Sequence, residues 1–424
     1  MNEFVVSNGI KIIYYPVNYV HSIVIGLYIR TGSRYEHPLN NGITHLLEHL
    51  HFRRMGTLSQ DEIYYRMESY GSTLRATTYK DYLRFHMKVR PNRLKECINL
   101  FQAILGSLNW TESEYEQEKT VVLNQVQERD SYLDIGQYVS KAVWKGNALS
   151  LPIMGNEETI NKIQLSDVIQ YKQTHFNPSQ IAFFITGCID SNGIDIVNSE
   201  LNKIALDDNQ DVQKPGFQNI KYQPRKPDIH LINTVGSYLD VNVSFDVNYE
   251  DATREELILL NCILGEGVGS RLQRVIREKS GLTSTIGSEL EEYEDAAVIH
   301  VNFSIHKKYV YDCLALVVET LNRMKDGIGT SDFDTTMPFY TENLWFWLDN
   351  PEELNHQLAH DYFVLNRAKR DIPERIDLFK QVNASRVMEI AKLIFKSERA
   401  SLVVLGSTGK LTKKEFTRIL KDLD

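Results

Sequence analysis

Cysteine is scarce in this chain of 424 residues: there are four, and no two of them form a Cys-x-x-Cys pair. The sequence therefore indicates neither a thiolate zinc site nor a dithiol redox motif. So few cysteines also fit a reducing compartment. They are Cys97, Cys188, Cys262 and Cys313.

Long apolar runs and blocks of basic residues are also missing. No stretch approaches the ~20 consecutive apolar residues of a membrane-spanning helix, so we expect no membrane span. The first residues, MNEFVVSNGIKIIYYPV, lack the basic and apolar regions of a secretory signal. The net charge is −9 at pH 7 without a basic block, which argues against nucleic acid as a partner. We expect an acidic, cytoplasmic enzyme.

The chain does contain enough apolar residues, 42% of 424, for two or three domains. Strand-like runs rich in Ile, Val and Tyr alternate with helical patterns, which predicts an α+β fold. Pro215, Pro224 and Pro227 stand between polar residues, a composition typical of a linker. We expect an N-terminal domain over 1–205, a linker over 206–227 and a C-terminal domain over 228–424.

The two halves resemble each other, which predicts a duplication. SDVIQYKQTHFNPSQIAFFITG, residues 166–187, is echoed about half a chain later by SRVMEIAKLIFKSERASLVVLG, residues 385–406. Each stretch reads as a helix followed by a buried strand. In the first half we expect strands over 11–17, 22–31, 72–78, 82–89 and 181–187, and helices over 61–69, 91–105, 112–130 and 166–175.

The most informative stretch is His45-Leu-Leu-Glu48-His49. On a helix, the two histidines lie one turn apart on one face, with Glu48 beside them. Two imidazoles can ligate zinc, and a nearby carboxylate can take a proton from a water molecule that the metal activates. The order His-x-x-Glu-His is the inverzincin signature. Two histidines at this spacing also occur by chance on amphipathic helices.

The residues around the motif favour a helix. Asn41 or Thr44 can cap its start, and Leu46, Leu47 and Leu50 give it an apolar side. GITHLLEHLHF resembles the zinc-site helix of the pitrilysin/insulinase family, which includes the mitochondrial processing peptidases, and the resemblance extends over most of the chain.

This resemblance implies a zinc metallopeptidase. It implies two tandem homologous α/β domains that form half of a clam-shell dimer, with His45 and His49 as zinc ligands and Glu48 as general base. In the family, the third ligand is the second glutamate of a Glu-x6-Glu pattern. Here that stretch is Glu118-KTVVLN-Gln125, so Gln125 stands at the ligand position and Glu118 at the supporting carboxylate.

A carboxamide oxygen is neutral, and the loss of a negative charge beside a dication weakens binding. Three interpretations remain open at this point. The chain is a metal-poor pseudo-peptidase, or Glu118 or Glu128 replaces Gln125 as ligand, or Gln125 is an engineered change.

The family also holds its peptide substrate against a strand with the pattern Gly-x-x-x-Asn-Ala-x-Thr, by adding the peptide to the sheet edge. The stretch from Gly71 to Thr78, GSTLRATT, matches it, with Ala76 and Thr78 in register and Arg75 in place of the asparagine. Arg75 either binds an acidic substrate, covers an empty site or discourages aggregation of an edge strand.

In the second half, family members carry an Arg and a Tyr seven residues apart, which bind substrate and stabilise the oxyanion. Arg277 matches the arginine, but the tyrosine position is Ser284, and Tyr293 is off the pattern. A homodimer would therefore lack this tyrosine, and we expect a heterodimer in which a homologous sister chain supplies it.

A second histidine pair, His356 and His360, has no acid between its members, so a helix-surface pair within a helix over 352–366 is favoured over a second zinc site.

Taken together, the motif and the resemblance lead us to expect a zinc-dependent metalloendopeptidase subunit that cleaves peptides in an enclosed chamber. By analogy, its role is the processing of a precursor peptide. The alternative is a non-catalytic subunit that binds peptide and completes a sister chain's active site.

Overall fold

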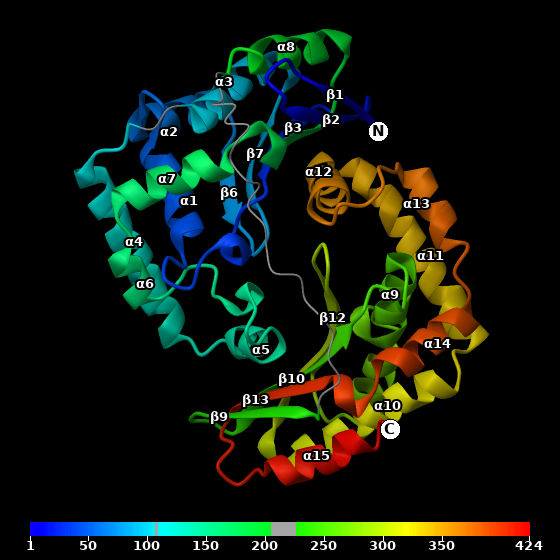
Figure 1. Ribbon diagram of the computed structural model, residues 1–424. Coiled ribbons are helices and arrows are strands. Elements are labelled where there is room, and N and C mark those ends of the chain that lie inside the picture. Colours follow the sequence, from blue (N-terminus) through cyan, green and yellow to red (C-terminus); the bar gives the residue numbers. More distant parts are fainter. Residues whose placement is uncertain (107–108, 205–225) are drawn as a thin grey trace. The chain divides into compact units, whose positions relative to one another are not determined.

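The chain folds into two compact units, each built from segments that are not contiguous in the sequence. The computed structural model describes residues 1–106, 109–204 and 226–424 (Figure 1). The first unit comprises the described residues of Met1–Leu133, Asn147–Gln218 and Phe346–Arg370. The second comprises those of Asp134–Gly146, Asn219–Trp345 and Asp371–Asp424.

The first unit contains a six-stranded sheet in the order β1-β2-β8-β3-β7-β6. β2 and β8 run parallel, and the other neighbours are antiparallel. The strands are β1 (Asn2–Val5), β2 (Lys11–Pro16), β3 (Ile23–Ile29), β6 (Arg75–Thr78), β7 (Leu83–Val89) and β8 (Ile181–Gly187). A separate small ribbon pairs β4 (Arg54–Met55) with β5 (Leu58–Ser59).

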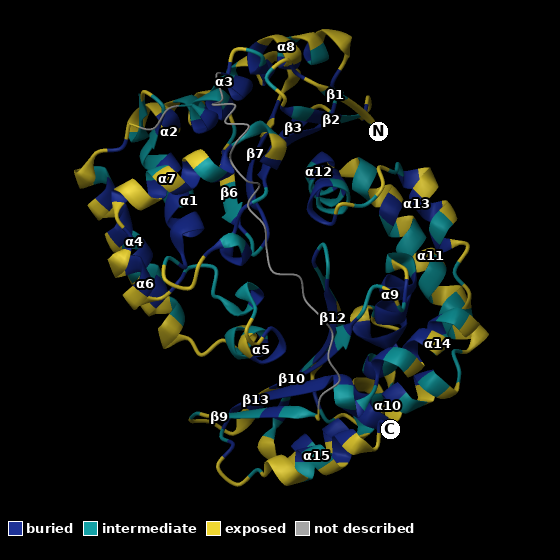
Figure 2. Cartoon of the chain, in the orientation of Figure 1, coloured by how far each residue is buried: buried dark blue, intermediate teal, exposed yellow. Residues whose placement is uncertain are grey.

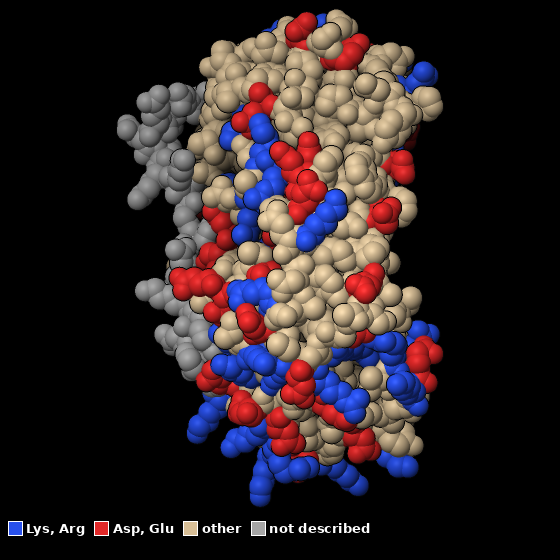
Figure 3. Space-filling model, turned by 90° about the vertical axis from the view of Figure 1, so that its right-hand side faces the viewer, with Lys and Arg blue, Asp and Glu red and all other residues tan. Residues whose placement is uncertain are grey.

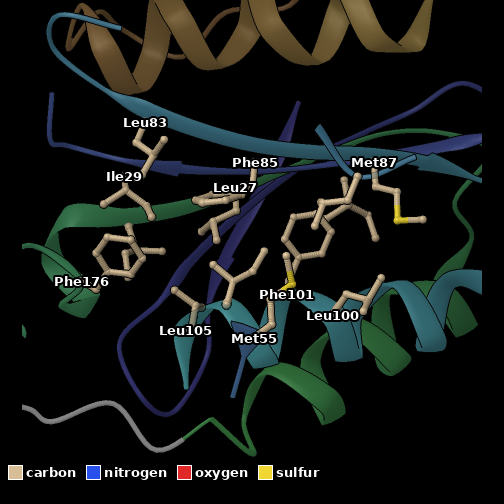
Figure 4. Packing of buried hydrophobic residues seen from close by; sticks show 14 of the residues in the cluster. Leu27, Ile29, Met55, Leu83, Phe85, Met87, Leu100, Phe101, Leu105 and Phe176 are labelled. Atoms are coloured by element: carbon tan, nitrogen blue, oxygen red, sulfur yellow. The ribbon is translucent and has the colours of Figure 1, made fainter. Parts of the chain in front are cut away.

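The core of the first unit lies between this sheet and its helices. Figure 4 shows apolar side chains of β3 and β7 above those of α3, among them Leu27, Phe85 and Phe101, all three fully buried. The helices of this unit are α1 (Ile43–Arg53), α2 (Gln60–Ser69), α3 (Leu94–Leu105), α4 (Glu112–Ser131), α6 (Glu157–Lys162), α7 (Leu165–His175), α8 (Ser191–Leu201) and α12 (Pro351–Ala359).

The second unit contains a five-stranded sheet in the order β11-β12-β10-β13-β9. Only β13 and β9 run parallel among its pairs within the described residues. Matching these strands in order to β6, β7, β3, β8 and β2 reproduces every strand direction. The strands are β9 (Asp228–Asn233), β10 (Tyr238–Val247), β11 (Thr285–Glu292), β12 (Ala297–His306) and β13 (Ala400–Gly406). The expected duplication is thus confirmed.

Helices cover the second sheet as well. Figure 2 shows β10 and β13 buried, whereas α10, α14 and α15 also carry exposed residues. The helices of this unit are α5 (Ile135–Val143), α9 (Arg254–Asn261), α10 (Val310–Asp326), α11 (Thr330–Phe346), α13 (Ile372–Phe379), α14 (Ala384–Ile394) and α15 (Lys413–Lys421). The stretches that echo each other form α7 with β8 and α14 with β13.

Each unit takes one helix from the other half of the sequence. α12 packs on β3 and β8 of the first sheet, and α5 packs on β10 and β13 of the second. Asn355 of α12 is fully buried. Its Nδ2 donates to the carbonyl of Phe184 at 2.7 Å, and its Oδ1 accepts from the hydroxyl of Tyr28 at 3.1 Å. These bonds fix α12 on the sheet face opposite the one that carries Leu27.

Two expected segments differ from the structure or cannot be compared with it. The strand expected over 72–78 begins only at Arg75. Before it, the hydroxyl of Ser72 donates to the carbonyl of Lys88, and the backbone N–H of Leu74 donates to Sδ of Met67. Residues 206–225 of the expected linker lie outside the described residues. The domain limits at 205 and 228 therefore stay predictions.

Among the described residues, no helix combines the length and the apolar character needed to cross a membrane. The cytoplasmic location stays a prediction. On the face shown in Figure 3, Lys and Arg side chains are interspersed with Asp and Glu side chains.

Candidate metal-binding site

Helix α1 carries the His-x-x-Glu-His motif on the face opposite its apolar side. Leu46, Leu47 and Leu50 are fully buried in the core of the first unit. The side chains of His45 and Glu48 keep small exposed fractions of 11% and 12%. The helical period thus places the apolar residues in the core and the polar triplet at the edge of that core.

The start of α1 is capped by a residue that the sequence did not single out. The N-cap is Gly42, with φ 97°, a left-handed conformation that glycine adopts without strain. The buried carboxylate of Glu36 accepts from the N–H of Gly42 at 2.7 Å, from the N–H of Thr44 at 2.9 Å and from Nδ2 of Asn41 at 2.7 Å. The expected caps, Asn41 and Thr44, are thus wrong, since a carboxylate from outside the helix satisfies the free N–H groups.

Helix α4 brings two side chains to the histidines. Glu118 and Gln125 are seven residues apart and so share one face. Nδ1 of His49 lies 2.7 Å from Oε1 of Glu118, and Nε2 of His45 lies 3.1 Å from Oε1 of Gln125. The two imidazole centroids are 4.6 Å apart.

Glu118 is held by two partners. Its other carboxylate oxygen accepts from Nε of Arg53, a residue that the sequence did not indicate, although it follows His49 by one helical turn. The bond from Nδ1–H of His49 leaves Nε2 of that ring with the free lone pair. Such a carboxylate fixes the tautomer and orientation of a metal-binding imidazole.

Glu48 is fixed by the sheet edge. The hydroxyl of Thr78, the last residue of β6, donates to Oε2 of Glu48, and the same oxygen lies 3.8 Å from Nδ1 of His45. The carboxylate therefore stands between the helix and the edge strand.

Burial and neighbouring charges act in opposite directions on these groups. Burial disfavours the imidazolium of His45, but the adjacent Glu48 carboxylate outweighs it and raises the pKa of His45. Burial also opposes ionisation of Glu48, but His45 and Thr78 outweigh it and lower the pKa of Glu48. For Glu118, burial is outweighed by the bonds from His49 and Arg53, which lower its pKa. Both glutamates are thus carboxylates at neutral pH.

The donor set around the histidines suits a zinc ion with one weak ligand. Within the described residues no three His, Cys, Asp or Glu side chains gather as a metal cluster. The candidate metal ligands are therefore one imidazole nitrogen each from His45 and His49 and the carboxamide oxygen of Gln125. Ligand atoms of a tetrahedral zinc ion with bonds of about 2.0–2.1 Å lie about 3.4 Å apart. The 3.1 Å between Nε2 of His45 and Oε1 of Gln125 is close to that value, so these two donor atoms are spaced as a zinc ion requires, and the second of them is neutral.

The two alternative acidic ligands, Glu118 and Glu128, have different surroundings. Glu118 is already bonded to His49 and Arg53. Glu128 is exposed on α4.

The predicted substrate-binding residues share β6, an edge strand in the described sheet. Alternation directs Ala76 and Thr78 to the α1 side and Arg75 to the other side. There Nη1 of Arg75 lies 3.7 Å from Oε1 of Glu352, and its side chain is 67% exposed.

The predicted residues of the second half belong to the second unit. Arg277 lies in the π-helical segment Gln273–Lys279, is 49% exposed and pairs with Glu278 at 3.6 Å. Ser284 lines a cavity of about 490 Å³ together with Gln273 and Asn302. Tyr293 is buried, and its hydroxyl donates to Glu291 at 2.5 Å. It is therefore engaged within its own unit.

His356 is not the helix-surface residue that the sequence suggested. Its Nε2 lies 2.9 Å from the hydroxyl of Tyr82, and burial lowers its pKa to about 3. The expected helix over 352–366 ends at Ala359 and continues as a π-helical turn, His360–Val364.

Known families match both halves of the chain. The model described as insulinase (peptidase family M16) matches residues 12–157, and the model described as peptidase M16 inactive domain matches residues 162–337. The first match contains the His-x-x-Glu-His motif and both α4 side chains.

Similar proteins cover nearly the whole chain. A Bacillus subtilis protein named "Uncharacterized zinc protease YmxG" is 25% identical over 97% of this chain and 99% of its own. The mitochondrial-processing peptidase subunit beta of Rattus norvegicus is 22% identical over 95% of this chain and 84% of its own. A crystal structure of a Helicobacter pylori protease has a TM-score of 0.86 at 21% identity, with 96% and 99% of the two chains covered, which shows a shared fold.

Proposed function

This chain belongs to the insulinase family, peptidase family M16, and we propose that it is a zinc-dependent metalloendopeptidase subunit. One observation carries the proposal. The carboxamide oxygen of Gln125 lies 3.1 Å from Nε2 of His45, while Glu118 orients His49 and Thr78 orients Glu48. A metal ion would replace the proton between His45 and Gln125, and it would use the lone pair that the bond to Glu118 leaves on Nε2 of His49.

His45, His49 and Gln125 would hold the zinc ion. When bound, zinc polarises the scissile carbonyl and acidifies the attacking water. Glu118 stays outside the ligand set and supports His49 with Arg53. The neutral Gln125 makes this site weaker than one with three ordinary ligands, because it supplies no charge to the dication.

Glu48 is the general base. Its lowered pKa keeps it ionised at neutral pH, so that it accepts the proton of the attacking water and returns it to the leaving amine. The hydroxyl of Thr78 donates to Oε2 and aims the carboxylate. A direct hydrogen bond thus links the general base, Glu48, to β6, the strand on which we propose the peptide binds.

The substrate is an extended peptide that pairs with β6, an edge strand of the described sheet. Arg75, Ala76 and Thr78 would contact it there. We propose that a homologous sister chain closes the chamber and supplies the tyrosine that Ser284 replaces, while Arg277 acts in the sister chain's site. The name of the rat relative describes a subunit, which supports such a pairing.

Cleavage by the tagged chain, purified from its own host with the chains that accompany it, tests the proposal. A quenched fluorescent peptide of unfolded sequence is the substrate. We expect zinc-dependent cleavage that falls about 10²–10⁴-fold in Glu48→Gln. Glu116→Gln, an exposed change on α4, is the control. Cleavage that survives Glu48→Gln, or no cleavage in any preparation, contradicts the proposal. Full activity of the isolated chain contradicts only the sister-chain part.

A second candidate function is a non-catalytic subunit that binds peptide for its partner's site. Gln125 and Ser284 favour it, since each replaces a group that the family uses. The candidates differ in one outcome: a non-catalytic subunit leaves the activity of the complex unchanged in Glu48→Gln.

A further inference from the structure

A group of charged side chains lies on the face of β6 and β7 that is turned away from α1. Arg75 of β6 and His86 of β7 are register partners, and Lys88 follows on the same face. Glu352 at the start of α12 meets all three. Its Oε1 lies 3.0 Å from Nε2 of His86 and 3.7 Å from Arg75, and its Oε2 lies 3.9 Å from Lys88.

This group carries a net positive charge at neutral pH. Burial, followed by the charge of Arg84, lowers the pKa of His86 to about 4, so its imidazole is neutral. Burial opposes ionisation of Glu352, but His86 outweighs it and the pKa of Glu352 is lowered. One carboxylate therefore faces two cations at long distances, and the side chains of Arg75 and Lys88 are 67% and 55% exposed.

A third cation, Arg84, lies on the same face of β7. Arg84 of β7 is the register partner of Thr77 and is only 6% exposed. Its Nε and Nη2 have no hydrogen-bond partner among the described residues, and its guanidinium lies 5.6 Å from the ring centre of Tyr28. A buried guanidinium adds to the positive potential of the surface near it, because the surrounding medium screens its charge poorly.

An added strand would bring peptide side chains to this group. Its residues alternate between the two faces of the sheet, so every second side chain lies on the Arg75 side while its neighbours face α1 and Glu48. The residue directly opposite Arg75 is close enough for a cross-strand charge pair.

We propose that Arg75 and Lys88 form a subsite for an acidic side chain, so that the peptide needs Asp or Glu at the position opposite Arg75. This inference rests on the proposed function only in using β6 as the peptide-binding edge. It assigns a substrate class that the metal site itself does not determine.

Peptide binding tests the subsite without any need for cleavage. The probe is a ten-residue peptide of Ala, Ser and Thr with an uncharged fluorophore, in which a single Glu is moved along the sequence, beside the matched Gln series. We expect one position at which Glu binds about fivefold tighter than Gln, with no such preference at the adjacent positions. Fluorescence anisotropy with the wild-type complex and with Glu48→Gln gives the affinities.

Charge reversal then assigns the preference to Arg75. Arg75→Glu should invert it, so that a Lys probe at the same position binds tighter than Glu. Arg93→Glu, an exposed reversal at the start of α3, should leave it unchanged. Equal affinity for Glu and Gln at every position overturns the subsite. Arg75 would then serve to prevent aggregation at the sheet edge. A clear Glu preference without cleavage supports the subsite and contradicts the peptidase.

Discussion

Gln125 places a neutral carboxamide oxygen 3.1 Å from Nε2 of His45. Seven residues earlier on the same helix, the carboxylate of Glu118 is bonded to His49 and Arg53. The negative charge nearest the histidines on α4 is thus in a supporting position, and the ligand position has none. If His45, His49 and Gln125 hold zinc as proposed, we expect the missing negative charge to limit its affinity.

The bond between Thr78 and Glu48 predicts a rate effect from an otherwise small change. Thr78→Val removes the hydroxyl donor and keeps the shape, so we expect kcat to fall about tenfold, the loss of one hydrogen bond to a charged group. Since that bond stabilises the ionised base, the acid limb of the pH profile of kcat/KM should move to higher pH. Thr77→Val, on the other face of β6, is the matched control. Identical profiles for the two variants would rule out this role of Thr78.

The cap at the start of α1 predicts a stability effect at a residue outside the motif. Glu36→Gln removes the charge and one acceptor from a carboxylate that holds three N–H donors. We expect the free energy of unfolding to fall by about 1–3 kcal/mol, measured from urea denaturation followed by circular dichroism. Glu68→Gln, exposed on α2, should change it by less than about 0.5 kcal/mol. Equal effects of the two changes would show that Glu36 does not cap the helix.

The buried histidines predict destabilisation by acid. Burial lowers the pKa of His175 to about 4, against 6.5 for an ordinary histidine. Between these values the unfolded chain binds a proton that the folded chain does not. The free energy of unfolding therefore falls as the pH drops from about 6.5 to about 4, by at most about 1.4 kcal/mol per pH unit for each such group.

His175→Phe isolates one of these protons. Phenylalanine keeps the stacking with Tyr171, whose ring centre lies 4.1 Å away. We expect the slope of the free energy of unfolding against pH to decrease by the equivalent of about one bound proton. Urea midpoints at several pH values measure the slope. His21→Phe, at an exposed position, should leave it unchanged. A slope as steep in His175→Phe as in the wild type would contradict the lowered pKa.

Local patterns in the sequence were enough to predict most of the fold. Residues 166–187 and 385–406 reveal the duplication, because helix and strand periods depend on nearby residues. The motif spacing likewise predicts that His45 and His49 share a face, and the seven-residue interval does the same for Glu118 and Gln125.

Long-range packing was not predictable in the same way. Asn355 of α12 forms hydrogen bonds with the sheet of the first unit, although it lies more than a hundred residues after the last strand of that sheet. No local sequence pattern predicts that this helix packs there. Glu36 caps α1 from six residues before Gly42, outside the usual capping positions. Arg53 lies one turn from His49, but only the structure shows that it shares Glu118.

The zinc content of the purified complex, measured by mass spectrometry after dialysis against metal-free buffer, tests the central claim most directly. We predict clearly less than one zinc ion per chain in the wild type and close to one in Gln125→Glu, with the increase abolished by adding His45→Ala. Glu116→Gln should match the wild type. A full equivalent of zinc in the wild type, or no gain in Gln125→Glu, would contradict the claim that this site has the geometry for zinc but lacks one charge.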